Sequence, residues 1–331
     1  MKEIRISSSD EKQKLIKFLH KYFRETSDGF LYKMLRKKNI VLNGEKADGK
    51  ELLKEGDVLS VFFSDETFEK LRGDVSLQDS LVADGYEAFR RFGHVPVIFE
   101  NEHILLLNKP SGILSQKASR TDLSLNEWMI GYLLREKAAS PDSLRSFHPS
   151  VCNRLDRNTS GLVICGKTPV GSHMMSAILN DRSVHKFYHL FVEGHMEKGA
   201  HIKSYLTKDS ATNTVTVSNT PSEDADLIET EYQPIKYFPL KHATLVEARL
   251  ITGKTHQIRA HLASAGFPLV GDAKYGNNAL FDRRKKEDHI FSQMLHAHRI
   301  VFPILPAPLD AVSGQTFIAD EPQSFLAFQR G

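Results

Sequence analysis

The feature that most constrains the fold is a change of sequence pattern near residue 93. From there on, short β-rich segments such as VPVIFE, GLVICG and ATLVEARLI alternate with helical stretches around 124–136, 170–181 and 255–265. A chain that mixes strands and helices in this way folds into an α+β domain. We therefore predict a mixed α+β domain over residues 93–331.

The composition predicts a globular chain with a substantial core. Hydrophobic residues make up 40% of the 331 residues and aromatic residues 9%, which excludes a disordered or fibrous class. No apolar run approaches the roughly 18 residues that a membrane helix needs, and the first residues lack the apolar centre of a secretory signal. These observations predict a cytoplasmic protein without membrane contact.

A metal site is not expected. The two cysteines, Cys152 and Cys165, do not have C-x-x-C spacing, so neither a disulfide framework nor a cysteine zinc site is supported. We interpret them as buried reduced thiols. The histidines of the second half also lack H-E-x-x-H spacing; those weighed as ligands are His256, His261, His296 and His298.

Residues 1–65 have the pattern of a small α/β unit. Apolar residues recur at helical spacing in two stretches, 15–23 and 31–35, which predicts a helix pair. A short strand then ends at Asn43-Gly44, a dipeptide suited to a tight turn, and another strand follows over 58–63. Residues 12–63 resemble the alpha-L RNA-binding module that was first named for a small-subunit ribosomal protein.

Positive charge is concentrated at this N-terminus. The formal net charge is only +3, yet residues 1–50 hold 13 Lys or Arg against 7 Asp or Glu. A solvated lysine-rich face is the ordinary explanation of such a run. The alternative is that one helix face holds an RNA phosphate backbone, and the residues expected to contact it are Lys33, Arg36, Lys37 and Lys38.

Two further segments are interpreted from charge and periodicity. Residues 66–92 mix charges with few strong apolar repeats, and we predict a linker with some helix. The stretch from Asp209 to Glu231 is negative and would repel phosphates, so we expect it to lie away from the RNA.

The first segment that can carry chemistry runs from Asn153 to Leu162. Within it, Asp156 stands between Arg154 and Arg157. A cation close to a carboxylate favours its ionised form, and an ionised carboxylate can act as a nucleophile or a base. An isolated string of this kind is more often a surface charge cluster, so the interpretation depends on its context.

The second segment, Lys186 to Gly194, alternates like a strand and places Tyr188 on the opposite face from Phe187 and His189. A tyrosine ring can stack on a base, although a tyrosine in a strand is more often part of the core.

The third segment, Arg249 to Leu262, has a turn at Gly253 followed by a helix with polar groups in its first turns. The N–H groups of a helix start suit a phosphate, and Arg259 can reach a carboxylate deeper in the site. The residues of this helix start that we expect to contact RNA are Lys254, Thr255, His256 and Gln257.

Together these segments resemble the RluA-type pseudouridine synthase family, in the right order. Lys109-Pro110-Ser111-Gly112 resembles the K-P-x-G of the family, and Leu295-His296-Ala297 resembles its L-H-A. The resemblance implies a mixed, largely antiparallel central sheet with flanking helices. It also implies that Asp156 is the catalytic aspartate, Tyr188 the active-site tyrosine and Arg259 the partner of the aspartate. Two residues differ from the family, since Asn153 replaces a common His and Lys254 a common Arg.

The expected function is therefore isomerisation of uridine to pseudouridine in structured RNA, without a cofactor or a metal. The resemblance implies large-subunit (23S) ribosomal RNA as substrate, with transfer RNA as the second choice, and we expect a monomer. One alternative is a non-catalytic RNA-binding or ribosome-assembly factor that keeps the fold. A metal or serine hydrolase is a third class, but the chain lacks metal-ligand spacing and a G-x-S-x-G elbow.

Overall fold

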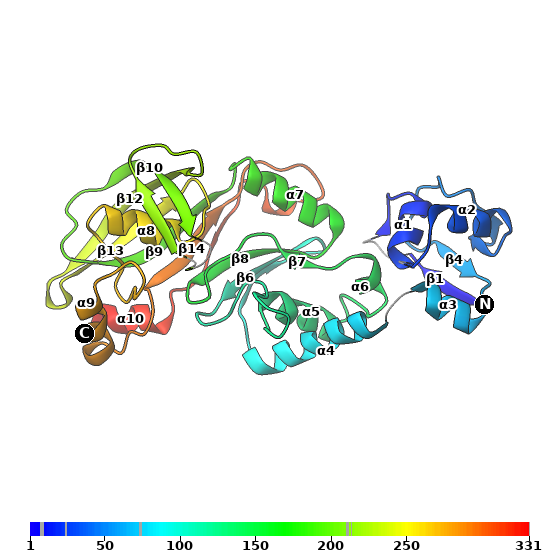
Figure 1. Cartoon of the computed structure of the whole chain (residues 1–331), viewed down its shortest axis with the longest axis horizontal. Helices are drawn as coiled ribbons and strands as arrows, with labels where there is room; N and C mark the ends of the chain where they lie inside the picture. The colour runs from blue at the N-terminus through cyan, green and yellow to red at the C-terminus, as the bar shows by residue number, and fades with distance from the viewer. Residues whose placement is uncertain (7–9, 24, 73–74, 210–211, 213, 331) are drawn as a thin grey trace.

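The computed structural model describes the whole chain except residues 7–9, 24, 73–74, 210–211, 213 and 331. The chain forms a small N-terminal lobe, up to residue 72, and a larger main lobe that contains the C-terminus (Figure 1). Arg72 of the N-terminal lobe donates a hydrogen bond of 2.6 Å to Asp142 of the main lobe. The predicted mixed α+β class is confirmed.

The N-terminal lobe combines the predicted helix pair with a small sheet. Its described strands pair antiparallel in the order β1-β4-β2-β3. Ser27 caps the second helix by accepting a hydrogen bond from the backbone N–H of Phe30, and Asn43 and Gly44 have the positive φ angles predicted for the hairpin turn. The elements are β1 (Lys2–Arg5), α1 (Leu15–Tyr22), α2 (Asp28–Arg36), β2 (Ile40–Leu42), β3 (Glu45–Lys46), β4 (Val58–Val61) and α3 (Asp65–Arg72).

The segment 66–92 differs from the expected linker. Helix α3 buries Phe68 in the N-terminal core, while α4 (Val75–Phe92) packs on α5 (Leu125–Arg135) in the main core. Small residues allow this packing, because a Cβ on Gly131 would lie 2.1 Å from the backbone oxygen of Gly85. Small side chains give little hydrophobic periodicity, and the sequence pattern therefore underestimates α4. Residues 73–74 of the segment lie outside the described residues.

A large sheet forms the centre of the main lobe. Its described strands number eleven and run in the order β11-β10-β12-β13-β9-β14-β8-β6-β5, with β15 beside β14 and β7 beside β8. All these pairs are antiparallel except β8 with β14, as the resemblance implied. The strands are β5 (Val97–Glu100), β6 (Ile104–Lys109), β7 (Ser150–Val151), β8 (Ser160–Gly166), β9 (His185–Glu193), β10 (Ala200–Asp209), β11 (Thr214–Ser218), β12 (Asp226–Phe238), β13 (Ala243–Leu250), β14 (Leu295–Val301) and β15 (Thr316–Ile318).

Helices flank this sheet, with α4 and α5 on one side of β6 and β8 and α7 on the other side (Figure 1). Helix α5 starts at a capping box in which Ser124 and Glu127 satisfy each other's backbone N–H groups. None of the helices in the described part of the chain is both long and apolar enough to cross a membrane. The remaining helices are α6 (Ser143–Ser146), α7 (Pro169–Asn180), η2 (Pro239–Lys241), α8 (Gln257–Ser264), α9 (Asn278–Glu287), η3 (Asp310–Val312) and α10 (Gln323–Arg330).

The parallel contact between β8 and β14 explains two of the sequence motifs. Gly161 has φ +110° and approaches β14 so closely that a Cβ would lie 2.3 Å from the backbone oxygen of Ala297. Next to it, the hydroxyl of Ser160 is 2.9 Å from Nδ1 of the buried His296. The Ser160-Gly161 pair therefore joins L-H-A to β8 and fixes the loop that precedes β8.

Candidate active site

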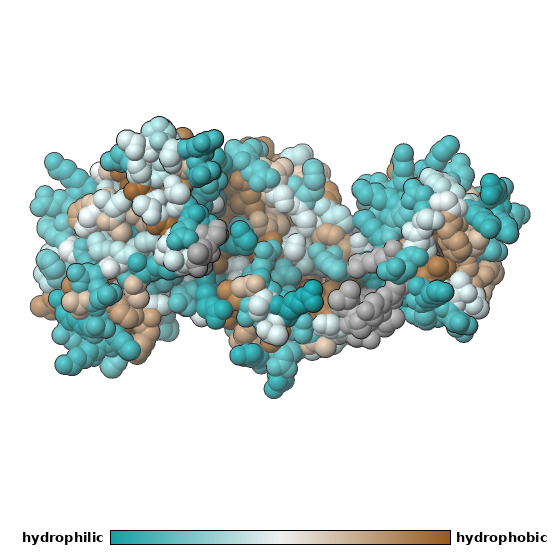
Figure 2. All heavy atoms as spheres, in the orientation of Figure 1, coloured by the Kyte–Doolittle hydropathy of each residue, from teal (hydrophilic) through white to brown (hydrophobic). Residues whose placement is uncertain are grey.

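A cavity of about 1030 Å³ lies between the loop 152–158, the start of β9 and the segment that leads into α8. Its lining includes Asp156, Tyr188 and Arg259, which come from three segments far apart in the sequence. Figure 2 shows a hollow between α7 and the strands β10 to β14, with hydrophobic residues at its bottom and hydrophilic residues around it. The fold thus brings the three motifs around one space.

The loop that carries Asp156 is held by hydrogen bonds from Lys109, in the K-P-S-G segment, and from Ser115, which follows it. The ammonium of Lys109 is fully buried and donates to the backbone oxygens of Pro110, Ile113 and Arg157. Ser115 both donates to and accepts from the backbone of Leu155, at 3.0 and 2.9 Å. Burial lowers the pKa of Lys109 to about 7, and the nearby charge of Asp156 opposes that shift.

Arg259 on α8 joins two carboxylates. Its Nε and Nη2 donate to the two oxygens of Asp272 at 2.7 and 2.9 Å, and its Nη1 donates to Oδ2 of Asp156 at 3.0 Å. Burial alone would raise the pKa of Asp272, but the hydrogen bonds and charge of Arg259 hold it below its ordinary value. A bidentate pair fixes the plane of the guanidinium, so Asp272 aims Nη1 of Arg259 at Asp156.

The two oxygens of Asp156 differ in their surroundings. Oδ2 accepts from Arg259 and lies 3.9 Å from Nε2 of His256. Within the described residues, Oδ1 has no hydrogen-bond partner, and the side chain is 26% exposed to the cavity. His256 is itself held by the hydroxyl of Tyr275 at 2.8 Å, and burial lowers its pKa although Asp156 raises it. One carboxylate oxygen is therefore anchored and the other is available.

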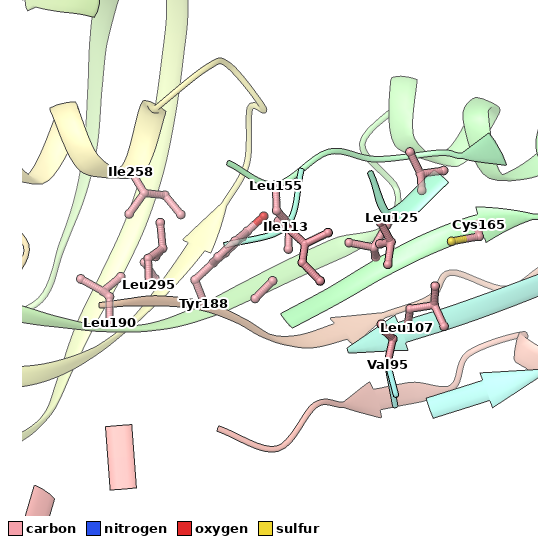
Figure 3. Packing of buried hydrophobic residues seen from close by; sticks show 14 of the residues in the cluster. Val95, Leu107, Ile113, Leu125, Leu155, Cys165, Tyr188, Leu190, Ile258 and Leu295 are labelled. Carbon is pink, nitrogen blue, oxygen red and sulfur yellow. The ribbon is translucent and has the colours of Figure 1, made fainter. Parts of the chain in front are cut away.

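Tyr188 forms part of the cavity wall. Its side chain is only 6% exposed and belongs to the main core. Figure 3 shows its ring between the sheet and Leu155, with the hydroxyl end directed towards Leu155. Burial raises the pKa of the Tyr188 hydroxyl above its ordinary value, and the charge of Asp156 adds to this effect. Tyr188 is therefore a neutral phenol at neutral pH, with a hydrogen to donate.

Comparison with known proteins identifies the family. Residues 103–264 match the family model described as RNA pseudouridylate synthase. The chain is also 30% identical, over 301 residues, to an uncharacterized RNA pseudouridine synthase of Mycoplasma genitalium, with 91% of this chain and 88% of the relative covered. This chain belongs to the RNA pseudouridylate synthase family. It is an RNA pseudouridine synthase, as the resemblance implied.

The chain is also similar to a second curated relative and shares its fold with a solved structure. It is 26% identical to the ribosomal large subunit pseudouridine synthase C of Rickettsia typhi, with 87% of this chain and 88% of the relative covered. The human protein named RNA Pseudouridylate Synthase Domain Containing 4 has the same fold, with a TM-score of 0.56 and 19% identity over 76% of this chain and 96% of that one. The resemblance of the N-terminal lobe to the alpha-L module remains a prediction.

Asp156 is paired with Arg259, as the resemblance implied, and not with the two arginines that flank it in the sequence. Arg154 and Arg157 are exposed, and among the described residues neither forms an ion pair with Asp156. The distant Arg259 takes that place, because the loop turns Asp156 towards α8 and away from its sequence neighbours. Both flanking arginines still line the cavity, where they can meet RNA.

At the start of α8, Gln257 is more buried than the residues before it. Lys254, Thr255 and His256 line the main cavity, but Gln257 is 2% exposed. Its side chain accepts from Thr252 and the backbone of Lys254 and donates to Thr230. Gln257 therefore fixes the turn at Gly253, and its amide group is held by the protein; the contact of Gln257 with RNA stays a prediction. A polar residue in a first helical turn looks the same in sequence whether it faces inward or outward.

The acidic stretch lies closer to the cavity than expected. Asp226, at the start of β12, accepts a hydrogen bond of 2.6 Å from Lys254. Both side chains are about half exposed, at 54% and 40%, and exposed ion pairs contribute little to stability. Lys254 is therefore paired with an acid of the protein, in an ion pair that adds little to the stability of the fold. No group of three or more His, Cys, Asp or Glu in the described chain is arranged to hold a metal ion.

Asp272, Lys109 and Ser115 are site residues whose roles the sequence pattern does not reveal. Asp272 is fully buried, yet Gly271-Asp272 looks like any polar turn. Lys109 and Ser115 act through backbone oxygens and N–H groups, which have no residue-type signature. The K-P-S-G match marks the segment without showing what it holds.

Proposed function

We propose that this synthase modifies uridine in large-subunit ribosomal RNA, with Asp156 as its catalytic carboxylate. The observation that carries the proposal is the position of Asp156, which is anchored through Oδ2 by Arg259 and borders a cavity with its other oxygen. The choice of ribosomal RNA is supported by relatives such as that of Rickettsia typhi, whose name states that substrate class. Transfer RNA is the second choice.

The reaction needs no redox step. The bond between the ribose C1′ and uracil N1 breaks, and a bond between C1′ and C5 forms after the base has turned. The hydrogen on C5 leaves as a proton and N1 takes up a proton, so substrate and product are isomers. Asp156 starts this sequence through Oδ1, as a nucleophile or as a base. Arg259 holds Oδ2, so the free oxygen keeps one orientation towards the flipped nucleotide.

Tyr188 supplies the surface for the base. Flipping a uridine out of its RNA context costs a few kcal/mol of stacking, and an aromatic ring returns about 1–3 kcal/mol per base. Because Tyr188 keeps its hydrogen at neutral pH, it donates a hydrogen bond rather than removing a proton. Its role is to place uracil against Asp156 while the glycosidic bond is broken.

The N-terminal lobe provides a second contact with RNA. Four cations on α2 and its exit are exposed, and within the described residues none of them pairs with an acid. Unpaired surface cations of this kind release counterions when they bind phosphates. We assign this contact to Lys33, Arg36, Lys37 and Lys38.

Tritium release tests the substrate and the catalytic residue together. Wild type and Asp156→Asn would be incubated with unmodified ribosomal RNA, or with transfer RNA, labelled with tritium at C5 of uracil. We expect release from ribosomal RNA by the wild type alone. Release from transfer RNA alone would move the substrate to the second choice. If RNA is bound but neither substrate releases tritium, the non-catalytic binding factor becomes the better explanation.

A charge variant tests the N-terminal contact. Replacing Lys33, Arg36, Lys37 and Lys38 with Gln should make RNA affinity less dependent on salt, because each lost phosphate contact lowers the slope by roughly 0.7–0.9. Lys285→Gln with Lys286→Gln on α9 is the control, since both are exposed and lie far from α2. Equal slopes for the two variants would refute the assignment.

A further inference from the structure

We propose that Lys186 and Arg182 form a phosphate subsite that holds a backbone phosphodiester of the RNA next to the target uridine. The inference rests on the proposed function of the same cavity and adds two residues to it. Lys186 begins the segment that carries Tyr188, but the sequence did not mark Lys186 or Arg182 as an RNA contact.

The position of Lys186 follows from the strand. It precedes Tyr188 by two residues on β9, so both side chains point to the same face of the sheet. Both line the main cavity, together with Arg182 from the turn between α7 and β9. The Nζ atom of Lys186 lies 3.7 Å from the place where a Cβ on Gly253 would be. The ammonium thus lies beside the turn that leads into α8, and it comes from the strand face that carries Tyr188.

Lys186 carries a partly buried charge without a protein partner. Among the described residues, no carboxylate or other hydrogen-bond acceptor contacts its ammonium group. Burial lowers the pKa of Lys186, and the charge of Arg182 lowers it further. A buried charge is costly unless it is paired, and the two cations also repel each other. An anion between them would remove both costs.

Other partly buried lysines of the main lobe show how the fold treats such charges elsewhere. They are paired with carboxylates at 2.6 Å: Lys117 with Asp84, Lys167 with Glu100, and Lys241 with Asp288. Lys186 is an exception among comparable side chains, and it is located at the cavity. The partner it lacks in the protein is therefore expected from the substrate.

The chemistry of the cavity identifies the anion. Within the described lining, Asp156 is the one acidic side chain, and its Oδ2 is already held by Arg259. The substrate class contributes one kind of anion, the phosphodiester, and Lys and Arg are its usual ligands. Lys186 and Tyr188 share one face of β9 and line the same cavity, so we assign the phosphate to the nucleotide on the Tyr188 ring or its neighbour. The subsite then fixes the backbone while the base is turned.

The test compares Lys186→Met and Arg182→Gln with Lys186→Arg and with Lys285→Met, a charge-loss control on α9. RNA binding and tritium release would be measured with unmodified large-subunit ribosomal RNA across a range of salt concentrations. We expect Lys186→Met to lower kcat/KM about tenfold, or ~1.4 kcal/mol, mainly through KM. The salt slope should fall by roughly 0.7–0.9, while Lys186→Arg keeps the wild-type slope.

Thermal unfolding separates a subsite from a structural role. Removing an unpaired buried charge should leave the Tm of Lys186→Met equal to that of the wild type or higher, since ligand sites are held at a cost in stability. A lower Tm with an unchanged salt slope would overturn the proposal. If the wild type releases no tritium, the proposed function fails, but the binding slopes still decide the subsite: a reduced slope in Lys186→Met supports it, and a slope equal to that of Lys285→Met refutes it.

Discussion

Two buried arginines of the main lobe have nearly the same surroundings, but they differ in the second carboxylate that each one binds. Arg259 is bidentate to Asp272 and donates to Asp156, while Arg284 is bidentate to Glu193 and donates to Asp288. An aromatic ring covers each guanidinium, at 5.1 and 5.3 Å from the ring centre. We call the two sets the Arg259 network and the Arg284 network.

The second carboxylate distinguishes the two networks. Asp288 is 5% exposed and also accepts from Lys241, so each charge in the Arg284 network is compensated by the protein. Asp156 is 26% exposed and has an oxygen without a partner among the described residues. A closed network stabilises the fold, whereas an open one presents a carboxylate in a fixed orientation. The same arrangement therefore serves structure at α9 and, in our proposal, catalysis at α8.

The largest expected effect comes from the second carboxylates. Asp156→Asn should reduce the rate of tritium release at least about a thousandfold, because it removes the group that starts the reaction. Its free energy of unfolding should stay near the wild-type value, since Arg259 keeps both bonds to Asp272. Asp288→Asn should do the reverse and lose about 3 kcal/mol of stability with turnover per folded molecule retained.

Single-turnover rates and denaturant unfolding measure these two quantities separately. Retained activity of Asp156→Asn would contradict a catalytic role of the Arg259 network. If Asp288→Asn is fully folded at low temperature but inactive, the Arg284 network contributes to the chemistry and its role is not structural alone.

A smaller difference is expected between the arginines themselves. Lysine cannot replace the fork of an arginine, so Arg259→Lys and Arg284→Lys should each lose about 3 kcal/mol of stability. Arg259→Lys should in addition lower turnover about a hundredfold, because a misplaced Asp156 reacts slowly, while RNA affinity changes less. Similar losses in turnover and in RNA binding would contradict the positioning role of Arg259, and kcat and Kd measured on the same preparations decide between them.

The convergence of the three motifs on one cavity could be predicted because the three segments together, and in this order, resemble one family. An aspartate between arginines or a tyrosine in an alternating strand, taken alone, is more often a surface charge cluster or part of a core. Partners that act through geometry leave no such signal. Asp272 is recognisable only when the chain after α8 is folded back onto Arg259, and the inward rotation of Gln257 depends on the turn at Gly253.

The helices and strands also differ in whether the sequence pattern predicts them. Strands and helices with strong apolar patterns, such as β6, β8 and α5, were predictable. Helix α4 was not, because it packs through Gly85 against Gly131 and through the ring of Phe89 on Trp128. Such contacts depend on a partner helix some forty residues away, which a local pattern does not contain.

The smallest expected effect is a difference in acid sensitivity between α8, which carries Arg259, and α9, which carries Arg284. Burial lowers the pKa of His261, two residues after Arg259 on α8, from 6.5 to about 4. Because the folded pKa is below the unfolded one, neutral His261 stabilises the fold in full above pH 6.5, and this contribution is lost as the pH falls towards 4. The carboxylate Asp288 behaves differently: burial would raise its pKa, but Lys241 and Arg284 hold it below 3.8, so Asp288 keeps its charge through this range.

At about pH 5, the lowered pKa of His261 should therefore reduce the free energy of unfolding of α8 by roughly 2 kcal/mol relative to neutral pH. The free energy of unfolding of α9 should not change. Hydrogen exchange of the α8 and α9 amides, corrected for intrinsic rates, measures the difference. His261→Gln, which can still bond Thr230 and Ser204, should remove the pH dependence of α8, and His173→Gln on the exposed face of α7 is the control. Equal loss of protection in α8 and α9 of the wild type would mean that the two networks unfold as one unit. The Arg259 network and the Arg284 network would then differ in their chemistry and not in their stability.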